Sequence, residues 1–343
     1  MKTLEPIDLI SQIANTENLL LAFYKARKTK DHRPEVQNYR KNLWQNLAIL
    51  KNEIETGNIN VGNYNYFTIT DPKKREICAA SFHERILHHA IMNVCHIYFE
   101  EFQTENSFAS RINRGTYAAL ELASQYNAKY QWYLKLDFRK YFNSINREIL
   151  INQLYELIPD TRVVLMFSKI IYSDNPASET GLPIGNLTSQ YFANHFLAIA
   201  DKFAQNELKT VAYIRYMDDV VIWHTSKYDL MKIERKYRNF VQNTLKLNLK
   251  PACLNTTSQP LAFLGYKLTG NKIALLKRSK SRFEKQLIKK NRLLEKNVIS
   301  QNEFVRCANS LVAFVKHAET LEYRKTFFEK INKGNYCMEA LTV

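Results

Sequence analysis

Two adjacent carboxylates, Asp218 and Asp219, interrupt a largely apolar stretch that runs from Ala212 to Trp223. Apolar runs on both sides of an acidic pair predict two buried strands joined by a tight turn, which requires a fold with an antiparallel hairpin in its core. Two carboxylates held side by side at a turn repel each other. A divalent cation relieves that repulsion, and Mg²⁺ prefers hard oxygen ligands. The alternative is an ordinary solvated Asp-Asp turn.

A third acid, Asp137, ends a second predicted strand that begins at Trp132. Two-metal phosphoryl-transfer sites need carboxylates from different strands to bridge both ions. One ion activates the attacking 3′-hydroxyl, and the other neutralises the charge that develops on the leaving pyrophosphate. We therefore predict that Asp137, Asp218 and Asp219 are catalytic, that they hold two Mg²⁺ ions (or Mn²⁺ as a substitute), and that the chain polymerises nucleotides.

The rest of the chain mixes helical and strand patterns. Helical spacing is predicted within 1–60, over 82–101, 145–157 and 187–200, and from about 280 onward. Alternation predicts a β-hairpin over 64–80 with a basic turn at 71–75, and a further strand over 261–268 that is followed by a hairpin signal at Gly270. Helices mixed with antiparallel hairpins predict an α+β fold.

The charge of the chain favours a polyanionic partner. Lys and Arg number 49 against 33 Asp and Glu, a formal net charge of +16. Such a field attracts nucleic acid, but it does not separate DNA from RNA or binding from catalysis. We see no signal peptide and no apolar run of membrane-spanning length. The five cysteines form no C-x-x-C pair, which fits a reducing cytoplasm.

Five segments in order resemble the boxes of reverse transcriptases. Tyr216-Met217-Asp218-Asp219 resembles the Y-x-D-D box, and Leu136–Phe142 resembles the first palm motif. The other three are Ser107–Gly115 in the fingers, Gly181–Gln190, and Phe263–Tyr266. One short box is weak support, whereas five in family order are strong. The resemblance implies a right-hand polymerase fold and RNA-directed DNA synthesis from dNTPs on a template RNA with a DNA primer.

The resemblance also implies a division of the chain. We expect an N-terminal helical extension at 1–60, fingers at 61–131, a palm at 132–275 with a fingers insertion around 160–185, and a helical thumb at 276–343. A basic amphipathic helix within the thumb would follow the template–primer backbone. Its predicted nucleic-acid contacts are Lys280, Arg282, Lys285, Lys289 and Arg292. The alternative is a solvated helix face.

The resemblance assigns roles to further residues. Phe142 would exclude a 2′-hydroxyl, and Phe138 would offer its backbone carbonyl to a metal ion. The predicted nucleotide-binding residues are Lys74, Arg75, Arg111, Phe142, Ile184, Gly185, Gln190, Tyr216 and Met217. The chain departs from the family after Leu249, because Ala252 and Cys253 stand where relatives commonly carry a lysine. Lys250, just before Pro251, is a weak substitute for it.

Ile184 and Gln190 narrow the resemblance. Most bacterial and group II intron enzymes read Q-G-x-x-x-S-P here, whereas this chain reads I-G-N-L-T-S-Q from Ile184 to Gln190. That form is similar to the reverse transcriptases of diversity-generating retroelements. They copy a template-repeat RNA with errors mainly opposite adenine, and they work with a small, basic, helical, oligomeric accessory variability protein. Isoleucine makes no hydrogen bond, so looser positioning of the base pair is expected. Each 1.4 kcal/mol lost from the free-energy difference between right and wrong base pairs raises the error rate about tenfold.

Two other interpretations stay open. A retron-like or phage-defence reverse transcriptase would have a similar length. A protein with a polymerase fold that only binds RNA would have no need of the three acids. We expect the chain to act in the cytoplasm of a bacterium, encoded there or by a phage, and to have no room after Asp219 for an RNase H, integrase or endonuclease domain.

Overall fold

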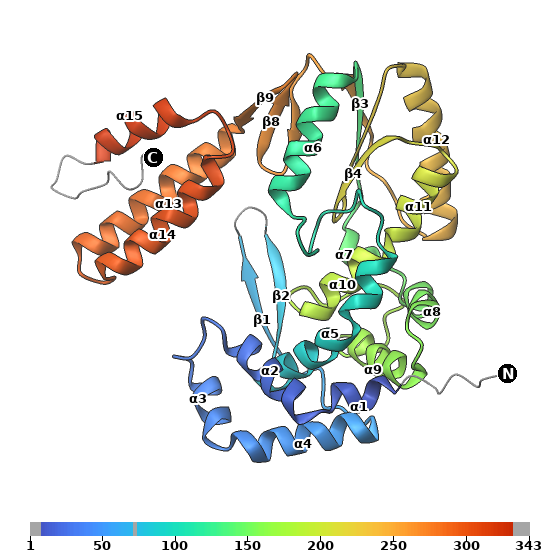
Figure 1. The fold of residues 1–343 in the computed structure, drawn as a ribbon, viewed down its shortest axis with the longest axis vertical. Helices are drawn as coiled ribbons and strands as arrows, with labels where there is room; N and C mark the ends of the chain where they lie inside the picture. The colour runs from blue at the N-terminus through green and yellow to red at the C-terminus, as the bar shows by residue number, and fades with distance from the viewer. Residues whose placement is uncertain (1–7, 71–73, 332–343) are drawn as a thin grey trace. The chain divides into compact units, whose positions relative to one another are not determined.

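The computed structural model describes residues 8–70 and 74–331. The N-terminal half contains α1 (Leu9–Ile13), α2 (Thr16–Arg27), α3 (Pro34–Lys41), α4 (Leu43–Thr56), β1 (Tyr64–Ile69), β2 (Arg75–Ala80), α5 (Phe82–Phe102), α6 (Thr116–Lys129), β3 (Trp132–Asp137), α7 (Tyr141–Ser144), α8 (Arg147–Leu157) and α9 (Thr161–Tyr172) (Figure 1). The mixture of helices and antiparallel strands confirms the predicted α+β class.

The C-terminal half begins with two consecutive helices and the acidic hairpin. It contains α10 (Leu187–Phe196), α11 (Ala198–Asn206), β4 (Ala212–Tyr216), β5 (Asp219–His224), α12 (Lys227–Thr244), β6 (Cys253–Thr256), β7 (Leu261–Phe263), β8 (Tyr266–Thr269), β9 (Lys272–Leu275), α13 (Lys277–Glu295), α14 (Gln301–Val315) and α15 (Leu321–Ile331). In the described part of the chain no helix has both the length and the apolar character that a membrane span needs.

Contacts divide the chain into two compact units. The first comprises Met1–Asn113, Leu136–Val220 and Ile233–Ala252, and the second comprises Arg114–Lys135, Val221–Lys232 and Cys253–Val343. The strands form a two-stranded sheet β1-β2, a four-stranded sheet in the order β4-β5-β3-β6, and a three-stranded sheet β7-β8-β9. All three predicted acids belong to the first unit. The four-part division into extension, fingers, palm and thumb stays a prediction.

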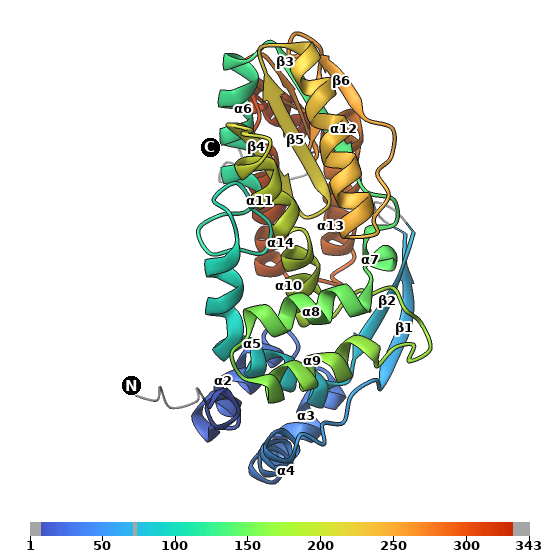
Figure 2. The same cartoon turned by 90° about the vertical axis from the view of Figure 1, so that its right-hand side faces the viewer.

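The first unit is organised around α5. The apolar residues of this helix, among them Ile86, Ile91 and Phe99, are buried, and α2 and α10 pack against it. Helices α8 and α9 lie side by side in the same unit (Figure 2). Helix α5 is capped at its N-terminus by Ser81, whose hydroxyl accepts a hydrogen bond from the Glu84 amide. The core of this unit therefore lies where the N-terminal helices meet α5 and α10.

The second unit contains packed helices and a small sheet. Helices α13, α14 and α15 share an apolar cluster made of Phe283, Leu287, Leu294, Phe304, Ala308, Val312, Val315 and Phe328. Helix α6 packs on β8, and Asn127 Nδ2 donates to the Gly270 carbonyl at 3.0 Å. The indole N–H of Trp223 donates to Asn127 Oδ1 at 3.3 Å. A buried asparagine thus joins α6, the β8–β9 turn and β5.

The single helix predicted over 187–200 is wrong, because the helix breaks at Leu197. The Leu197 amide bonds to the His195 carbonyl rather than to that of Ala193. The Ala193 carbonyl instead accepts the Tyr141 hydroxyl, and the Asn194 carbonyl accepts Arg215 Nη2 at 3.1 Å. Side chains from elsewhere have entered the helical ladder, which divides it into α10 and α11.

The single strand predicted over 261–268 is also wrong, because it is a hairpin. Leu264 and Gly265 have φ values of 49° and 91°. Positive φ at both central residues is the signature of a type I′ turn, which joins two strands directly. Phe263 pairs with Tyr266 across that turn. The apolar run at this place therefore folds back on itself.

Candidate active site

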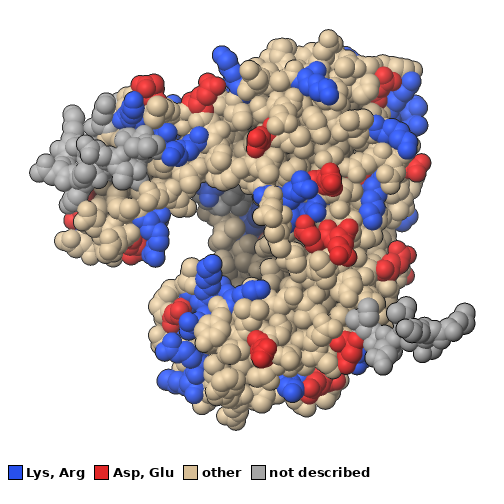
Figure 3. Space-filling view, viewed as in Figure 1, with Lys and Arg blue, Asp and Glu red and all other residues tan. Residues whose placement is uncertain are grey.

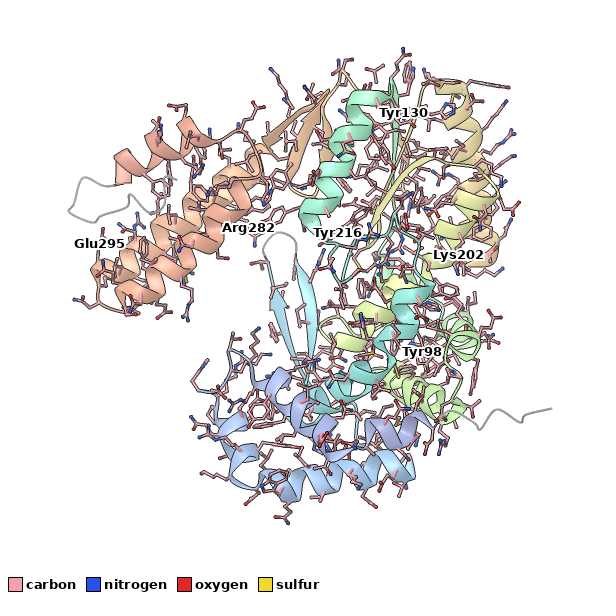
Figure 4. The ribbon with its side chains drawn as sticks, viewed as in Figure 1. Tyr98, Tyr130, Lys202, Tyr216, Arg282 and Glu295 are labelled. Atoms are coloured by element: carbon pink, nitrogen blue, oxygen red, sulfur yellow. The ribbon has the colours of Figure 1, made fainter. Side chains whose placement is uncertain are left out.

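The acidic pair lies at a tight turn, as predicted. Strand β4 ends at Tyr216, Met217 and Asp218 form the turn, and Asp219 begins β5. Met217 has a φ of 53°. A side chain at positive φ costs about 1–2 kcal/mol, so surrounding contacts must hold this turn. Figure 4 shows Tyr216 at the end of β4.

Arg215 supplies the contacts that hold the turn at Met217 and Asp218. Its guanidinium is fully buried and forms a bidentate ion pair with Asp201, with a shortest N–O distance of 2.6 Å. Nη1 also donates to the Met217 carbonyl at 3.2 Å and to Asn194 Oδ1 at 2.7 Å. Nη2 donates to Ser107 Oγ at 3.0 Å. One side chain therefore connects the segment at Ser107, α10, α11 and the turn that carries Asp218.

The three acids influence one another electrostatically. Burial raises the pKa of Asp218, and the negative charges of Asp219 and Asp137 raise it further. The Lys250 ammonium acts in the opposite direction. Asp218 is thus held in a place where its own charge is disfavoured unless a cation is near.

Lys250 already supplies a cation to Asp137. Its Nζ lies 2.6 Å from Asp137 Oδ2. Strand β3 pairs Lys135 with Cys253, whereas Phe138 bridges Leu249. The chain thus carries one extra residue on the Leu249–Cys253 side, as in a β-bulge, and such a bulge re-aims a side chain. Lys250, the weak substitute predicted from the sequence, therefore contacts the Asp137 carboxylate directly.

The fit of a divalent ion follows from the donor set. Three mutually repelling carboxylates are the hard oxygen ligands that Mg²⁺ prefers. Within residues 8–70 and 74–331, however, no three side chains of His, Cys, Asp or Glu lie close enough together to hold a metal ion. The carboxylates suit the ion chemically, and in this structure Asp137 Oδ2 accepts a hydrogen bond from the Lys250 ammonium.

The residues that follow Asp137 are rigidly placed. The Lys250 amide donates to the Asp137 carbonyl at 2.8 Å, and the Arg139 amide donates to the Asn248 carbonyl at 2.9 Å. These two hydrogen bonds lie on either side of the residue pair Phe138 and Leu249, which share no hydrogen bond with each other. The Phe138 carbonyl therefore points away from Leu249. Phe142 is half-buried on α7, and its carbonyl accepts the Leu182 amide at 2.9 Å.

The segment from Ile184 to Gln190 is fastened to β2. The Cys78 amide donates to the Ile184 carbonyl at 2.7 Å. Gly185 has a φ of 125°, and a Cβ there would lie 2.8 Å from Ile77 Cγ2, so only glycine allows this close approach. Gln190 is exposed. Ile184 and Gly185 therefore lie against the hairpin that also carries the predicted Lys74 and Arg75, whereas Gln190 belongs to α10.

The three basic residues predicted to bind triphosphate differ in their surroundings. Lys74 and Arg75 are exposed on the hairpin. Arg111 instead forms an ion pair with Glu100 at 2.8 Å, and its Nη1 donates to the carbonyls of Thr104 and Ser107. As the structure stands, Arg111 holds together the loop that follows α5. Its contact with a nucleotide stays a prediction that requires these bonds to exchange.

The basic residues predicted on the thumb belong to α13 in the second unit. Lys280, Arg282, Lys285, Lys289 and Arg292 are all at least partly exposed. Lys285, Lys289 and Arg292 line a hollow of about 400 Å³ together with the apolar Ile288 and Leu293. Arg282 is labelled on this helix in Figure 4. Cationic groups beside an open apolar strip suit a polyanion backbone.

Sequence reasoning missed Arg215 and Asp201. The signal for Arg215 was a lone charge inside an apolar strand, because such a charge is buried only with a partner. Nothing local pointed to Asp201 as that partner, since it lies on a different element. Tyr141, whose hydroxyl helps to break the α10–α11 helix, gave no signal beyond its place in the first palm motif.

Comparisons with known proteins identify the family to which the chain belongs. Residues 70–268 match the family described as reverse transcriptase (RNA-dependent DNA polymerase). The group II intron-encoded protein LtrA of Lactococcus lactis subsp. cremoris is 22% identical over 60% of this chain and 46% of its own length. The putative COX1/OXI3 intron 1 protein of Saccharomyces cerevisiae is 21% identical over 76% of this chain and 39% of its own. The chain thus spans less than half the length of these relatives.

Solved structures share the fold. Apo telomerase from Candida tropicalis superposes with a TM-score of 0.50 at 12% identity, over 80% of this chain and 59% of that one. Telomerase from Candida albicans, in complex with a fragment of telomeric RNA, gives 0.50 at 10% identity over 81% and 57%. This likeness confirms the predicted right-hand polymerase fold. The match over residues 70–268, which contains all three acids, shows that the chain belongs to the reverse transcriptase family.

Proposed function

We propose that the chain is an RNA-directed DNA polymerase whose catalytic carboxylates are Asp137, Asp218 and Asp219. The observation that carries the proposal is the turn at Met217, which places Asp218 where burial and the charges of Asp219 and Asp137 disfavour its ionisation. A site of this kind gains most from divalent cations. Two bound Mg²⁺ ions would supply Lewis-acid activation of the 3′-hydroxyl and neutralise the leaving pyrophosphate.

The side chains of the chain itself have distinct tasks in this proposal. Asp137 and Asp218 would hold the ions through their carboxylates, and the Phe138 carbonyl, which points away from Leu249, would serve as a further oxygen ligand. Phe142 lies under the sugar and excludes the 2′-hydroxyl of an rNTP. Lys74 and Arg75 approach the triphosphate from the hairpin, as a point charge and as a bidentate fork respectively.

Asp218→Asn tests the catalytic assignment. The variant should lose dNTP incorporation on a primed RNA template by at least about a thousandfold, the scale of losing one essential electrostatic contact. Asp31→Asn, an exposed acid whose partner is Arg27, is the matched control and should keep wild-type incorporation. Wild-type rates in Asp218→Asn would remove the metal-site assignment. The template RNA, the DNA primer and accessory factors must be present, because an inactive wild type decides nothing about the variant.

We further propose that the enzyme copies adenine with high error, as a diversity-generating retroelement would. Ile184 carries this proposal, because its carbonyl is bonded to Cys78 while its side chain offers no hydrogen bond where relatives place glutamine. Base selection then rests on shape alone, and the free-energy gap between right and wrong pairs shrinks. The partners of this reaction would be a template-repeat RNA and a small basic oligomeric accessory protein in a bacterial cytoplasm.

Sequencing the cDNA tests the error proposal. Misincorporation should be several-fold higher opposite adenine than opposite the other bases, and Ile184→Gln should reduce that excess. Ile112→Gln, a change of the same chemistry at an exposed position, should leave it unaltered. Equal error at all four template bases would contradict the proposal while leaving the polymerase assignment intact.

A further inference from the structure

Asn186 lies at the N-cap position of α10, yet its side chain does not cap that helix. Asparagine is among the residues most favoured at this position, because its Oδ1 accepts a hydrogen bond from an amide of the first turn. Here Oδ1 is buried without a hydrogen-bond partner in the described part of the chain, and Nδ2 donates to the Tyr64 hydroxyl at 3.1 Å. The side chain therefore leaves its own helix uncapped and bonds to strand β1 instead.

The Tyr64 hydroxyl continues this hydrogen bonding to helix α9. It lies 2.6 Å from Ser173 Oγ, and the Ser173 hydroxyl donates to the Ile170 carbonyl at 2.7 Å. Because Ser173 has a single hydroxyl proton, Tyr64 is the donor between the two. The hydrogen bonds therefore run in one direction, from Asn186 through Tyr64 and Ser173 to the last turn of α9. Phenylalanine at position 64 would interrupt this series at its centre.

The backbone beside Tyr64 is closely held as well. The Gly62 amide donates to Glu84 Oε2 at 3.1 Å, and a Cβ on Gly62 would lie 2.8 Å from the Ser173 carbonyl oxygen. Glu84 is fully buried at the start of α5. Burial raises the pKa of Tyr64 and the charge of Glu84 raises it further, so the hydroxyl keeps its proton at physiological pH. Tyr64 is thus a fixed donor and acceptor where β1, α5 and α9 meet.

Three restraints hold the segment 184–186 against the β1–β2 hairpin. The Cys78 amide donates to the Ile184 carbonyl at 2.7 Å, and Gly185 packs so closely on β2 that only glycine fits. Both of these restraints come from β2. The Tyr64 hydroxyl is the third restraint and comes from β1, so it fixes the segment from a second strand.

We propose that Tyr64 is a positioning residue for base selection, which acts by fixing Asn186 and with it the segment 184–186. The inference rests on the proposed function, in which this segment lies beside the templating base and the incoming nucleotide. Tyr64 itself precedes the residues that match the reverse transcriptase family. Groups that select a substrate have to be held within about 0.5 Å of the productive geometry. Without the Tyr64 hydroxyl, Asn186 is free to rotate and cap α10, and β2 alone holds the segment.

The hydrogen bond between Asn186 and Tyr64 is separate from the charges that attract nucleic acid. Asn186 is 2% exposed, whereas Lys and Arg side chains gather on the surface over the connection between α2 and α3 (Figure 3). Removing one hydroxyl changes no surface charge. Tyr64→Phe should therefore leave the affinity for primer–template and its salt dependence as in wild type. Changed nucleotide selection with unchanged nucleic-acid affinity is the signature of positioning.

Steady-state incorporation on a primed RNA, under the conditions used for Asp218→Asn, tests the role of the hydroxyl. Tyr64→Phe should raise the KM for dNTP by about threefold or more while kcat stays within about twofold. Misincorporation should rise by about threefold or more opposite all four template bases. The control is Tyr66→Phe, the same change two residues along β1, where the ring is 49% exposed. It should leave both quantities unchanged. Equal effects of the two variants, or none in Tyr64→Phe, would overturn the inference.

Two substitutions of Asn186 separate its bond to Tyr64 from ordinary helix capping. Asn186→Ser keeps a residue that caps helices well but whose side chain is one bond shorter, whereas Asn186→Ala removes both abilities. Both should reproduce the KM and error changes of Tyr64→Phe. The double variant Tyr64→Phe/Asn186→Ser should be no worse than either single variant, because each removes the same hydrogen bond. Wild-type values in Asn186→Ser, or additive losses in the double variant, would contradict the proposed role.

Hydrogen exchange reports on this hydrogen bond without dNTP. The Cys78 amide is the reporter, because it donates to the Ile184 carbonyl. Its exchange should be about fivefold faster in Tyr64→Phe and Asn186→Ser than in wild type or Tyr66→Phe. If wild type incorporates no dNTP, the proposed function fails, and the exchange pattern alone decides whether Tyr64 fixes the segment. If that pattern holds while KM and errors match wild type, the hydroxyl is structural only, so the inference fails and the polymerase assignment stands.

Discussion

Arg215 lies two residues before the turn that carries Asp218, and it decides how that turn is held. Its ion pair with Asp201 is completely buried. Such a pair contributes little relative to apolar residues of the same size, but removing one partner costs about 3–5 kcal/mol because a buried charge is left alone. Its bond to the Met217 carbonyl is the part that reaches the site. Arg215 is thus a positioning residue for the strained turn.

Arg215→Lys should separate positioning from simple stability. Lysine keeps the charge beside Asp201 but lacks the planar fork that also reaches Asn194 and Met217. We expect incorporation to fall by at least about tenfold in kcat with little change in the KM for dNTP, alongside a loss of a few kcal/mol in urea unfolding. Arg27→Lys, a half-buried arginine whose acidic partner is Asp31, is the control. A stability loss with unchanged kcat would mean that Arg215 is structural only.

Asp137 and Lys250 make a second residue-scale prediction. The Lys250 ammonium lies 2.6 Å from Asp137 Oδ2, so a divalent ion and Lys250 compete for the same oxygen. Lys250→Gln should therefore tighten Mn²⁺ binding several-fold, measured by the loss of the free-ion electron paramagnetic resonance signal without substrate. Lys246→Gln, an exposed lysine on the same connection, should leave Mn²⁺ binding unchanged. Weaker Mn²⁺ binding in Lys250→Gln would show that Lys250 supports the site rather than competing for it.

Neutralising Asp218 should stabilise the fold while it abolishes catalysis. Burial and the charges of Asp219 and Asp137 disfavour the ionised Asp218 carboxylate, so at neutral pH its charge costs folding free energy. Asp218→Asn should raise the free energy of unfolding at pH 7 without divalent ions. Mg²⁺ should then raise the thermal midpoint of wild type more than that of the variant. A variant that melts below wild type in the absence of Mg²⁺ would contradict this account.

At the scale of elements, local patterns predicted the site strands well. The apolar run that ends in an acid predicted β3 over Trp132–Asp137, and the acidic pair predicted the β4–β5 turn. Both signals lie within a few residues of the structure they specify. The break at Leu197 could not be predicted in the same way, since its causes are Tyr141 and Arg215 from other elements. The Leu264–Gly265 turn was concealed because leucine rarely adopts a φ of 49°.

Gly185 joins two elements and offers a test of that junction. A Cβ at this position would lie 2.8 Å from Ile77 Cγ2 and 3.1 Å from the Cys78 carbonyl, at a φ that L-residues avoid. Gly185→Ala should therefore cost about 1–3 kcal/mol in unfolding free energy. Ile77→Ala in the same chain should recover part of the loss, because it removes the nearer contact. Gly57→Ala, where a Cβ meets nothing within 4 Å, isolates the backbone cost. Equal losses at both glycines would contradict the close approach.

For the whole molecule, the site depends on contacts that are remote in sequence. Asp137 meets Lys250 across 113 residues, and Arg215 reaches Gln103 across 112. Residue types and box order predicted Asp137, Asp218 and Asp219 as the catalytic acids, and this assignment stays a prediction. They could not predict that Asp137 is paired with a lysine, or that Arg111 is engaged with Glu100, because both depend on tertiary packing. The cavity lined by Lys30, Arg33 and Arg85 was equally hidden, since its lining comes from four separate segments of the chain.

Buried histidine makes the stability of the whole molecule depend on pH. Burial lowers the pKa of His195 to about 4, with Lys202 and Arg215 adding to the effect against a backbone contact at Gln153. In the unfolded chain His195 takes up a proton near its ordinary pKa of about 6.5. The unfolded state therefore binds more protons between pH 6.5 and 4, and stability falls as pH drops through that window. Over the whole window, His195 lowers the free energy of unfolding by roughly 3 kcal/mol.

His195→Gln isolates that contribution. The variant's free energy of unfolding, taken relative to that of wild type, should rise as the pH falls from 7 to 4.5, by up to roughly 3 kcal/mol. Urea unfolding at several pH values measures this change. Carboxylates with a lowered pKa, such as Asp160, lose their contribution to folding stability only near pH 3.8 and below. They therefore do not contribute to the change between pH 7 and 4.5. His32→Gln, at an exposed position, should give a pH-independent difference. A parallel pH dependence in His195→Gln and wild type would mean that His195 is protonated in the folded chain, and that the α10 helix accommodates the charge beside Phe99 and Phe102.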